Sequence, residues 1–183
     1  MSGTTDEYYY VVDSGGTELA HAKMGTPLAF FPGRYDVKLN STTQPAEVPS
    51  GGAVELKSGT LHVRGSTDEY YYVLSGTGTE LAHNKLGRPL SFVEGSYTVK
   101  VNNTTVAAKV EAGQSNEYAT GTLTVKGTGS DYYYVVDGAS GTELAHAKVG
   151  QPVALAAGKY SVRLGKDTRP ATVTAGQAAV VNW

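Results

Sequence analysis

The chain contains no cysteine in its 183 residues, which excludes disulfide bonds, thiol catalysis and cysteine-ligated zinc sites. No apolar run approaches the roughly 18 residues that a membrane-spanning helix requires, so we expect no membrane insertion. Charge is also scarce: 15 Lys and Arg residues face 17 Asp and Glu residues, giving a net charge of −2. Without a basic patch, the electrostatic footprint of a nucleic-acid-binding protein is missing.

The opening residues, MSGTTDE, have neither the basic start nor the apolar stretch of a signal peptide. Hydrophobic residues make up 40% of the chain and charged residues 17%, so a core can form. The 23 glycines and 13 tyrosines favour β structure over helix.

An internal repeat dominates the sequence. The tyrosine motif occurs three times, as DEYYYVVD at 6–13, DEYYYVLS at 68–75 and SDYYYVVD at 130–137. Two further motifs recur with it: GTELAH at 16–21, 78–83 and 141–146, and Gly-x-Tyr at 33–35, 95–97 and 158–160. The period is about 62 residues, with one residue inserted near Ala139 in the third copy. The predicted repeats span 1–58, 59–120 and 121–183.

Both ends of the chain fall at a repeat joint. The segments GTLHVRG (59–65) and GTLTVKG (121–127) precede the second and third tyrosine motifs, whereas the first motif has no such segment before it. The chain ends at Trp183, where another such segment would begin. We therefore expect a stretch trimmed from a longer array.

Period-two patterns predict strands. RYDVKLN (34–40) alternates apolar and polar residues, which is typical of an antiparallel strand with one wet face. PLAFFPG (27–33) places Leu28 and Phe30 on one face, and its Pro-Gly predicts a hairpin turn with a left-handed glycine. TELAHAKM (17–24) is too short between its flanking glycines for a good helix, so strand is favoured.

These patterns give about six or seven short strands in each repeat. The predicted fold is all-β: three tandem small antiparallel β-sandwich repeats without substantial helix. The Pro-Leu strand, the Gly-x-Tyr-x-Val-x-Leu strand and the closing Ala-Gly-Gln (112–114 and 175–177) resemble the PEGA-type or transthyretin-like sandwich repeats of bacterial surface proteins. The resemblance covers essentially the whole chain. It implies an envelope or extracellular module and carries no catalytic residues.

The tyrosine motifs allow two interpretations. In the first, they form a central strand whose rings pack against neighbouring strands. In the second, one face is open and offers stacking rings to a sugar or a partner, with three weak sites adding through avidity. The candidate ligand-binding residues are Tyr8, Tyr9, Tyr10, Tyr70, Tyr71, Tyr72, Tyr132, Tyr133 and Tyr134.

Histidines recur at one position, as His21, His83 and His146, each three residues after a glutamate. On a regular strand, Glu18 and His21 would point to opposite faces, so no pair of metal ligands is evident. We expect surface histidines, His62 included, and predict no metal site and no cofactor.

Other polar motifs favour turns. Asp13 and Asp137 begin the turn segments DSGG and DGAS, but Ser75 takes this place in the second repeat, so turn chemistry fits better than a calcium loop. Asn40-Ser41-Thr42 and Asn102-Asn103-Thr104 match the glycosylation acceptor pattern.

The sequence predicts no enzyme, because it offers no nucleophile–base pair, phosphate-binding loop or paired carboxylates. Three function classes remain: a rigid spacer within a larger surface protein, a carbohydrate-binding module using the tyrosines, and a unit that self-associates through open sheet edges. We expect an extracytoplasmic location, at the cell surface or in the periplasm. The expected partner is an envelope or extracellular polymer or protein.

Overall fold

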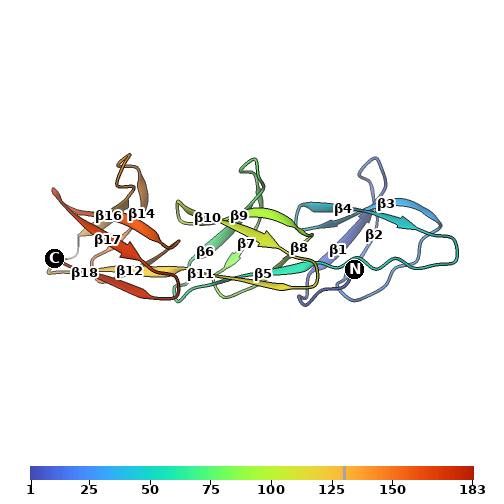
Figure 1. The fold of residues 1–183 in the computed structure, drawn as a ribbon, viewed down its shortest axis with the longest axis horizontal. Helices are drawn as coiled ribbons and strands as arrows, with labels where there is room; N and C mark the ends of the chain where they lie inside the picture. Colours follow the sequence, from blue (N-terminus) through green and yellow to red (C-terminus); the bar gives the residue numbers. More distant parts are fainter. Residues whose placement is uncertain (130) are drawn as a thin grey trace.

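The computed structural model describes residues 1–129 and 131–183, so Ser130, which opens the third tyrosine motif, lies outside the described residues. The described chain forms 18 strands and no helix, as the alternating patterns predicted. None of its elements is a helix long and apolar enough to cross a membrane. The repeats follow one another along a rod, with the first repeat at one end and the third at the other (Figure 1).

Each repeat contains a four-stranded antiparallel sheet in which the tyrosine strand is central. The orders are β2-β1-β3-β4, β7-β6-β9-β10 and β14-β13-β16-β17. The strands of these sheets are β1 (Tyr8–Val12), β2 (Glu18–Lys23), β3 (Gly33–Leu39), β4 (Thr42–Val48), β6 (Tyr70–Leu74), β7 (Glu80–Lys85), β9 (Gly95–Val101), β10 (Thr104–Val110), β13 (Tyr132–Val136), β14 (Glu143–Lys148), β16 (Gly158–Leu164) and β17 (Asp167–Val173).

The second and third repeats add a three-stranded sheet, with the orders β11-β5-β8 and β15-β12-β18. Its strands are β5 (Gly59–Arg64), β8 (Leu90–Phe92), β11 (Ser115–Ala119), β12 (Gly121–Lys126), β15 (Pro152–Leu155) and β18 (Ala178–Asn182). β5 pairs with β8 in antiparallel and with β11 in parallel orientation, and β12 pairs likewise with β15 and β18. The parallel pairs depart from a purely antiparallel sandwich, because the chain enters and leaves a repeat in the same direction along the rod.

The core of a complete repeat lies between its two sheets. In the second repeat, Leu61 and Val63 of β5 pack with Phe92 of β8 against Tyr71 and Val99 of the four-stranded sheet. Each strand contributes alternate residues, as a period-two pattern requires. The all-β sandwich expectation is therefore confirmed for this repeat, and the third is built in the same way.

The first repeat differs, because its only sheet among residues 1–58, all of which the structure describes, is the four-stranded one. The strand expected over 27–33 is not formed before Gly33, although β8 and β15 occupy the equivalent places in the other repeats. Met1 and Ser2 align with Val63 and Arg64, the last two residues of β5, and Ser2 makes a single parallel bridge with Lys57. A sandwich needs a central strand in its second sheet, and in the first repeat Met1 and Ser2 stand at only the last two positions of that strand.

The expected left-handed turn glycine at Pro32-Gly33 is wrong. Gly33 opens β3 with a φ of 159°, close to extended, rather than the value of about 80° in a type II turn. A Cβ at Gly33 would lie 3.6 Å from the Tyr35 hydroxyl, which is an ordinary contact, whereas the equivalent glycines of the other repeats are closer to their tyrosines. The hydroxyls of Tyr35 and Tyr160 donate to the carbonyls of Phe31 and Ala156, at 2.9 and 2.8 Å. A Cβ at Gly158 would lie only 3.0 Å from the Tyr160 hydroxyl.

Candidate functional site

The middle tyrosine of each motif belongs to the core. Tyr9, Tyr71 and Tyr133 are buried, and their hydroxyls donate to the carbonyls of Thr26, Arg88 and Gln151 at 2.7, 2.7 and 2.8 Å. Burial raises the pKa of all three phenols. These three tyrosines therefore support the sheet, and the two outer tyrosines of each motif are the ones that reach the surface.

The outer tyrosines of each motif lie on the surface around a histidine. Tyr8 is 45% exposed and Tyr10 39% exposed, and their ring centroids lie 5.8 and 5.5 Å from that of His21. The same arrangement recurs as Tyr70, Tyr72 and His83 in the second repeat, and as Tyr132, Tyr134 and His146 in the third. We call each set of two outer tyrosines and one histidine an aromatic platform.

A glutamate fixes the histidine of each platform, contrary to the expectation that Glu18 and His21 point to opposite faces. The Glu18 carboxylate lies 2.7 Å from His21 Nδ1, and the two equivalent pairs have the same distance. A β-bulge explains the difference. Val11 pairs with Ala20 and Val12 with Glu18, so Leu19 is the extra residue. Because one residue is inserted between them, side chains three apart share a face.

A cation completes each platform. The Lys23 ammonium lies 5.9 Å from the ring centroid of Tyr8, and Lys85 and Lys148 repeat this contact at 5.9 and 5.8 Å. The third platform has a second cation, Arg163, 5.1 Å from the Tyr134 ring. Exposed rings beside an ammonium, an imidazole and a carboxylate combine stacking faces with hydrogen-bonding groups.

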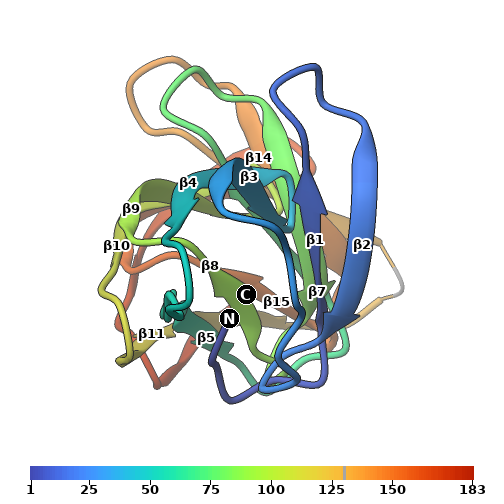
Figure 2. The ribbon, with the colours of Figure 1, turned by 90° about the vertical axis from the view of Figure 1, so that its right-hand side faces the viewer.

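The platforms lie on hairpins that share a side of the rod. The β1–β2, β6–β7 and β13–β14 hairpin loops all project the same way in Figure 1, and Figure 2 shows them side by side when the rod is viewed along its length. A cleft of about 870 Å³ lies between the second and third hairpins. Tyr70 and Tyr72 line it from the second repeat, Glu143 and His146 from the third, and Lys100 also contributes.

The histidines are not grouped with two or more other potential metal ligands in the part of the chain that the structure describes. Among residues 1–129 and 131–183, no group of three or more His, Asp or Glu side chains is placed to hold a metal ion. His62 is half-buried rather than a free surface residue, and its Nε2 lies 3.0 Å from the Gly87 carbonyl oxygen.

The aspartates at the hairpin tips act in turns, as predicted. Asp13 accepts hydrogen bonds from the backbone N–H groups of Gly15 and Thr17 at 2.9 and 2.8 Å. The Ser75 hydroxyl accepts the equivalent bonds in the second repeat, from Thr77 and Thr79. At Asp137, hydrogen bonds from Ser140 and Ala139 lower the pKa of the carboxyl.

A second feature, which we call the joint clamp, connects successive repeats. A Glu7 carboxylate oxygen accepts the Ser91 N–H at 2.7 Å, while the Asn40 amide donates to the Ser91 carbonyl at 2.9 Å. Glu7 and Asn40 also bond to each other. Two side chains of the first repeat thus bind both backbone groups of one residue in β8 of the second repeat.

The clamp is repeated at the next joint. Glu69 accepts the Ala154 N–H at 2.7 Å, and Asn102 donates to the Ala154 carbonyl at 2.9 Å and to Glu69 at 2.7 Å. Asn40 and Asn102, which match the glycosylation acceptor pattern, thus use their side-chain amides at the joints. In the third repeat, Asp131 and Gly165 stand at the glutamate and asparagine positions.

The clamp meets a requirement of the fold. β8 and β15 are edge strands, which present backbone groups that need partners. Threonine hydroxyls add to it: Thr5 lies 2.6 Å from the Ser91 hydroxyl, Thr4 lies 2.8 Å from that of Thr60, and Thr104 accepts the Ala156 N–H at 2.9 Å. This site was not predicted from the sequence. Its signal was a Glu and an Asn shared by the first two repeats and changed in the third.

Comparison with known proteins adds little to this geometry. No family model matches the chain, and no curated protein matches it. One solved structure, the TIE protein of Bacillus anthracis, is 14% identical with a TM-score of 0.31, and the match covers 96% of this chain and 46% of that chain. The chain thus spans less than half the length of that protein. A match this weak supports no conclusion about the fold or the function of the chain.

Proposed function

We propose that the chain is a non-catalytic, rigid spacer or assembly region of a larger cell-surface or envelope protein. The observation that carries the proposal is the joint clamp, made twice with the same two distances, 2.7 and 2.9 Å. Hydrogen bonds to a charged carboxylate are worth about 1.5–3 kcal/mol each, so a clamp resists bending at the joint.

Two further observations support stiffness. β11 and β12 are separated by Thr120 alone, so the chain passes from the second repeat to the third without a flexible linker. Ala154 of the third repeat also belongs to the buried core cluster of the second. The second and third repeats therefore share part of a core as well as a direct strand connection.

The surface location rests on a resemblance of motifs. The Gly-x-Tyr-x-Val-x-Leu strand and the closing Ala-Gly-Gln are similar to PEGA-type and transthyretin-like repeats, which favours an extracytoplasmic module. The all-β tandem architecture is compatible with that family.

Distance distributions between spin labels test the rod. The chain has no cysteine, so Ser14→Cys and Lys166→Cys, both at exposed positions, can be labelled without background. Electron paramagnetic resonance should give one narrow distance distribution. In a Glu69→Ala, Asn102→Ala background it should broaden, whereas the position-matched control Asp131→Ala should leave it narrow. A broad distribution in the otherwise unchanged chain would refute the spacer function.

The aromatic platforms support a second function, carbohydrate binding. Three similar platforms on one side of the rod, and a cleft of about 870 Å³ lined by Tyr70 and Tyr72, suit a linear polymer that contacts several repeats. Stacking on exposed rings would provide weak affinity at each platform, and avidity would raise the total.

A panel of soluble and insoluble polysaccharides tests this function. The triple variant Tyr8→Ala, Tyr70→Ala, Tyr132→Ala should lose binding while keeping its circular dichroism spectrum, because these rings are close to half exposed. A matched control replaces the exposed bulge residue Leu19 by Ser and should bind normally. If no polysaccharide binds, or if the triple variant binds as well as the original chain, the platforms are not a glycan site.

A further inference from the structure

The outer face of each four-stranded sheet carries a row of side chains that crosses the aromatic platform. Residues that pair directly on neighbouring antiparallel strands point to the same face of a sheet. In the first repeat, Tyr10 pairs with His21 of β2 on one side and with Lys38 of β3 on the other. Lys38 in turn pairs with Thr43 of β4. The row therefore consists of a histidine, a tyrosine, a basic residue and a threonine.

The row recurs with the same kinds of residue in the other two repeats. Its members are His83, Tyr72, Lys100 and Thr105 in the second repeat, and His146, Tyr134, Arg163 and Thr168 in the third. In every repeat an imidazole thus flanks the tyrosine ring on one side and a cation flanks it on the other. We call the basic residues of the three rows the row cations: Lys38, Lys100 and Arg163.

The row cations have no acidic partner. Across residues 1–129 and 131–183, none of the three forms an ion pair. Arg163 is exposed and lies over the Tyr134 ring, 5.1 Å from its centroid, while Lys100 is half-buried opposite Tyr72. A cation in this position can bind an anionic group of a molecule that stacks on the neighbouring ring.

The acidic side chains that line the cleft between the second and third hairpins are already bonded within the chain. Glu80 and Glu143 are bonded to the platform histidines, Asp68 to Lys85, and Glu69 to the backbone of the joint clamp. Lys100 lines the same cleft, and no carboxylate of the described residues pairs with it. The charged group that is left to bind a ligand is therefore a cation.

The first repeat differs in the charge of this outer face. Asp36 lies two residues before Lys38 on β3, and Glu47 pairs with Arg34 across β3 and β4. The equivalent positions of the other repeats hold no acidic residue: Thr98 and Lys109 in the second, and Ser161 and Thr172 in the third. The two carboxylates oppose an anion at the first row, so an anionic ligand should favour the second and third rows.

We propose that the second and third platforms bind an anionic polysaccharide, whose sugar rings stack on Tyr72 and Tyr134 and whose carboxylate or sulfate groups pair with Lys100 and Arg163. The proposal rests on the carbohydrate-binding function proposed above and names the class of its ligand. The cleft of about 870 Å³ is lined by Tyr72 and Lys100 of one row and by His146 of the next, so a linear chain that crosses it meets both rows.

Matched charged and neutral polysaccharides test the ligand class on the intact chain. Isothermal titration calorimetry at low salt should show saturable binding of polygalacturonate. Its highly methyl-esterified form keeps the backbone without the charge and should bind at least about tenfold more weakly. Dextran sulfate and dextran form a second pair, which distinguishes sulfate from carboxylate as the anionic group. Poly-L-glutamate, a polyanion without sugar rings, should bind at least about tenfold more weakly than the preferred charged polysaccharide, because it cannot stack on the tyrosines.

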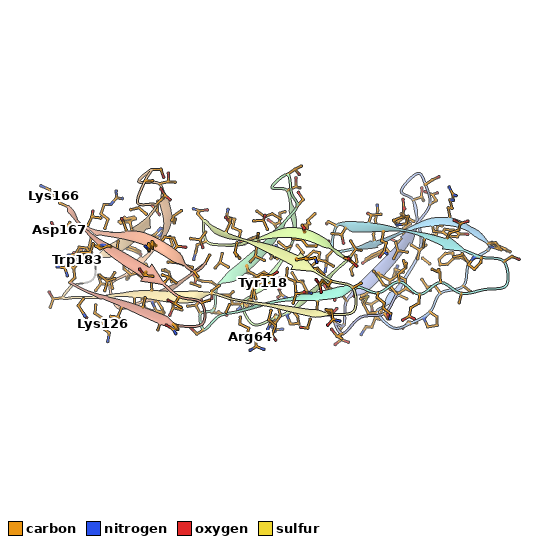
Figure 3. The ribbon with its side chains drawn as sticks, in the orientation of Figure 1. Arg64, Tyr118, Lys126, Lys166, Asp167 and Trp183 are labelled. Carbon is orange, nitrogen blue, oxygen red and sulfur yellow. The ribbon has the colours of Figure 1, made fainter. Side chains whose placement is uncertain are left out.

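Two double variants that remove the same charge locate the site. Lys100→Gln with Arg163→Gln should weaken binding by about tenfold, because two exposed ion pairs are lost. The control, Arg64→Gln with Lys126→Gln, also removes one Arg and one Lys. Figure 3 shows these two residues on the side of the rod away from the hairpin loops, so the control should bind within about twofold of the original chain. Lys38→Gln should likewise change binding by less than about twofold, because its face carries two carboxylates.

Preference for the charged member of either pair supports the proposal. Equal binding of the charged and neutral members of both pairs overturns it and leaves carbohydrate binding itself intact, whereas no binding of any polysaccharide overturns both. Equally tight binding of poly-L-glutamate, or an equal loss in the control variant, would show a general attraction between charges and also overturns the proposal.

Discussion

The first and second repeats are the same sequence unit with and without one strand. Their four-stranded sheets have the same order and the same bulge, and their platforms have the same distances within 0.1 Å. Yet residues 28–30 and 53–57 form no strand among the first 58 residues, all described, while their equivalents are β8 and β11. β8 and β11 thus form strands where β5 lies between them, and their equivalents in the first repeat do not.

The core residues of the two repeats also differ in how deeply they are buried. Phe92 is fully buried, whereas its equivalent Phe30 is only half-buried. Tyr71 is fully buried, whereas Tyr9 keeps 3% exposure. A strand that contributes two apolar side chains therefore determines how much the residues opposite it can stabilise the repeat.

We expect the largest loss of folding stability, and the largest difference between the repeats, when these two phenylalanines are replaced by alanine. Phe92→Ala should destabilise the second repeat by about 3–5 kcal/mol, because it empties a fully enclosed site. Phe30→Ala should cost less than about 1.5 kcal/mol, since its ring is already partly in water. Urea unfolding followed by circular dichroism measures both, and hydrogen-exchange mass spectrometry assigns the loss to a repeat. Equal costs would mean that Phe30 is as enclosed in solution as Phe92.

Leu61→Ala should make the second repeat resemble the first. Removing this fully buried side chain should cost about 2–5 kcal/mol, and amide exchange should accelerate in β8 and β11. The matched control is His62→Ala, whose side chain points away from the core residues on either side of it. Unchanged exchange in β8 and β11 would show that these strands do not depend on β5.

At alkaline pH, the repeats should lose stability to different extents because their middle tyrosines are buried to different extents. Burial raises the pKa of Tyr71 and Tyr133 strongly and that of Tyr9 less. Their folded pKa values lie above the unfolded value of about 10, so the stability they contribute is present below pH 10 and is lost as pH rises beyond it. Urea unfolding between pH 8 and 12 should show this loss, and Tyr71→Phe should reduce it. A stability independent of pH above 10 would contradict the prediction.

The smallest effect concerns the hydroxyls themselves. Tyr71→Phe and Tyr9→Phe each remove a hydrogen bond of 2.7 Å to a backbone carbonyl, so each should cost about 0.5–1.5 kcal/mol at neutral pH. Similar costs in the two repeats would show that the four-stranded sheets are equivalent, and that only the second sheet distinguishes them. A much larger cost in one repeat would contradict that equivalence.

Much of the fold could be predicted from alternation alone. The alternation in RYDVKLN predicted the strand that the structure shows as β3. The short length of TELAHAKM between its glycines favoured strand over helix, and this segment forms β2. The central-strand interpretation of the tyrosine motif agrees with the sheet orders, but the pattern could not say which face was open. The middle ring is buried in every repeat because the second sheet, or its remnant, covers that face.

The features that the sequence did not predict depend on contacts between strands that are distant in the sequence. Glu18 and His21 meet only because a bulge at Leu19 shifts the register, and no local pattern marks that bulge. Glu7 and Asn40 lie 33 residues apart and act on Ser91 of the next repeat. The strand expected at 27–33 failed because β propensity needs a partner strand, which the first repeat does not supply among its described residues.

The parallel pairing of β5 with β11 has a mechanical consequence. The chain enters the second repeat through β5 and leaves it through β11, so tension along the rod pulls these neighbours in opposite directions. Their ladder is then loaded in shear, and its hydrogen bonds share the force instead of opening one at a time. β12 and β18 transmit load in the same way in the third repeat. Under tension, therefore, the complete repeats should hold longest, and the first should extend before them.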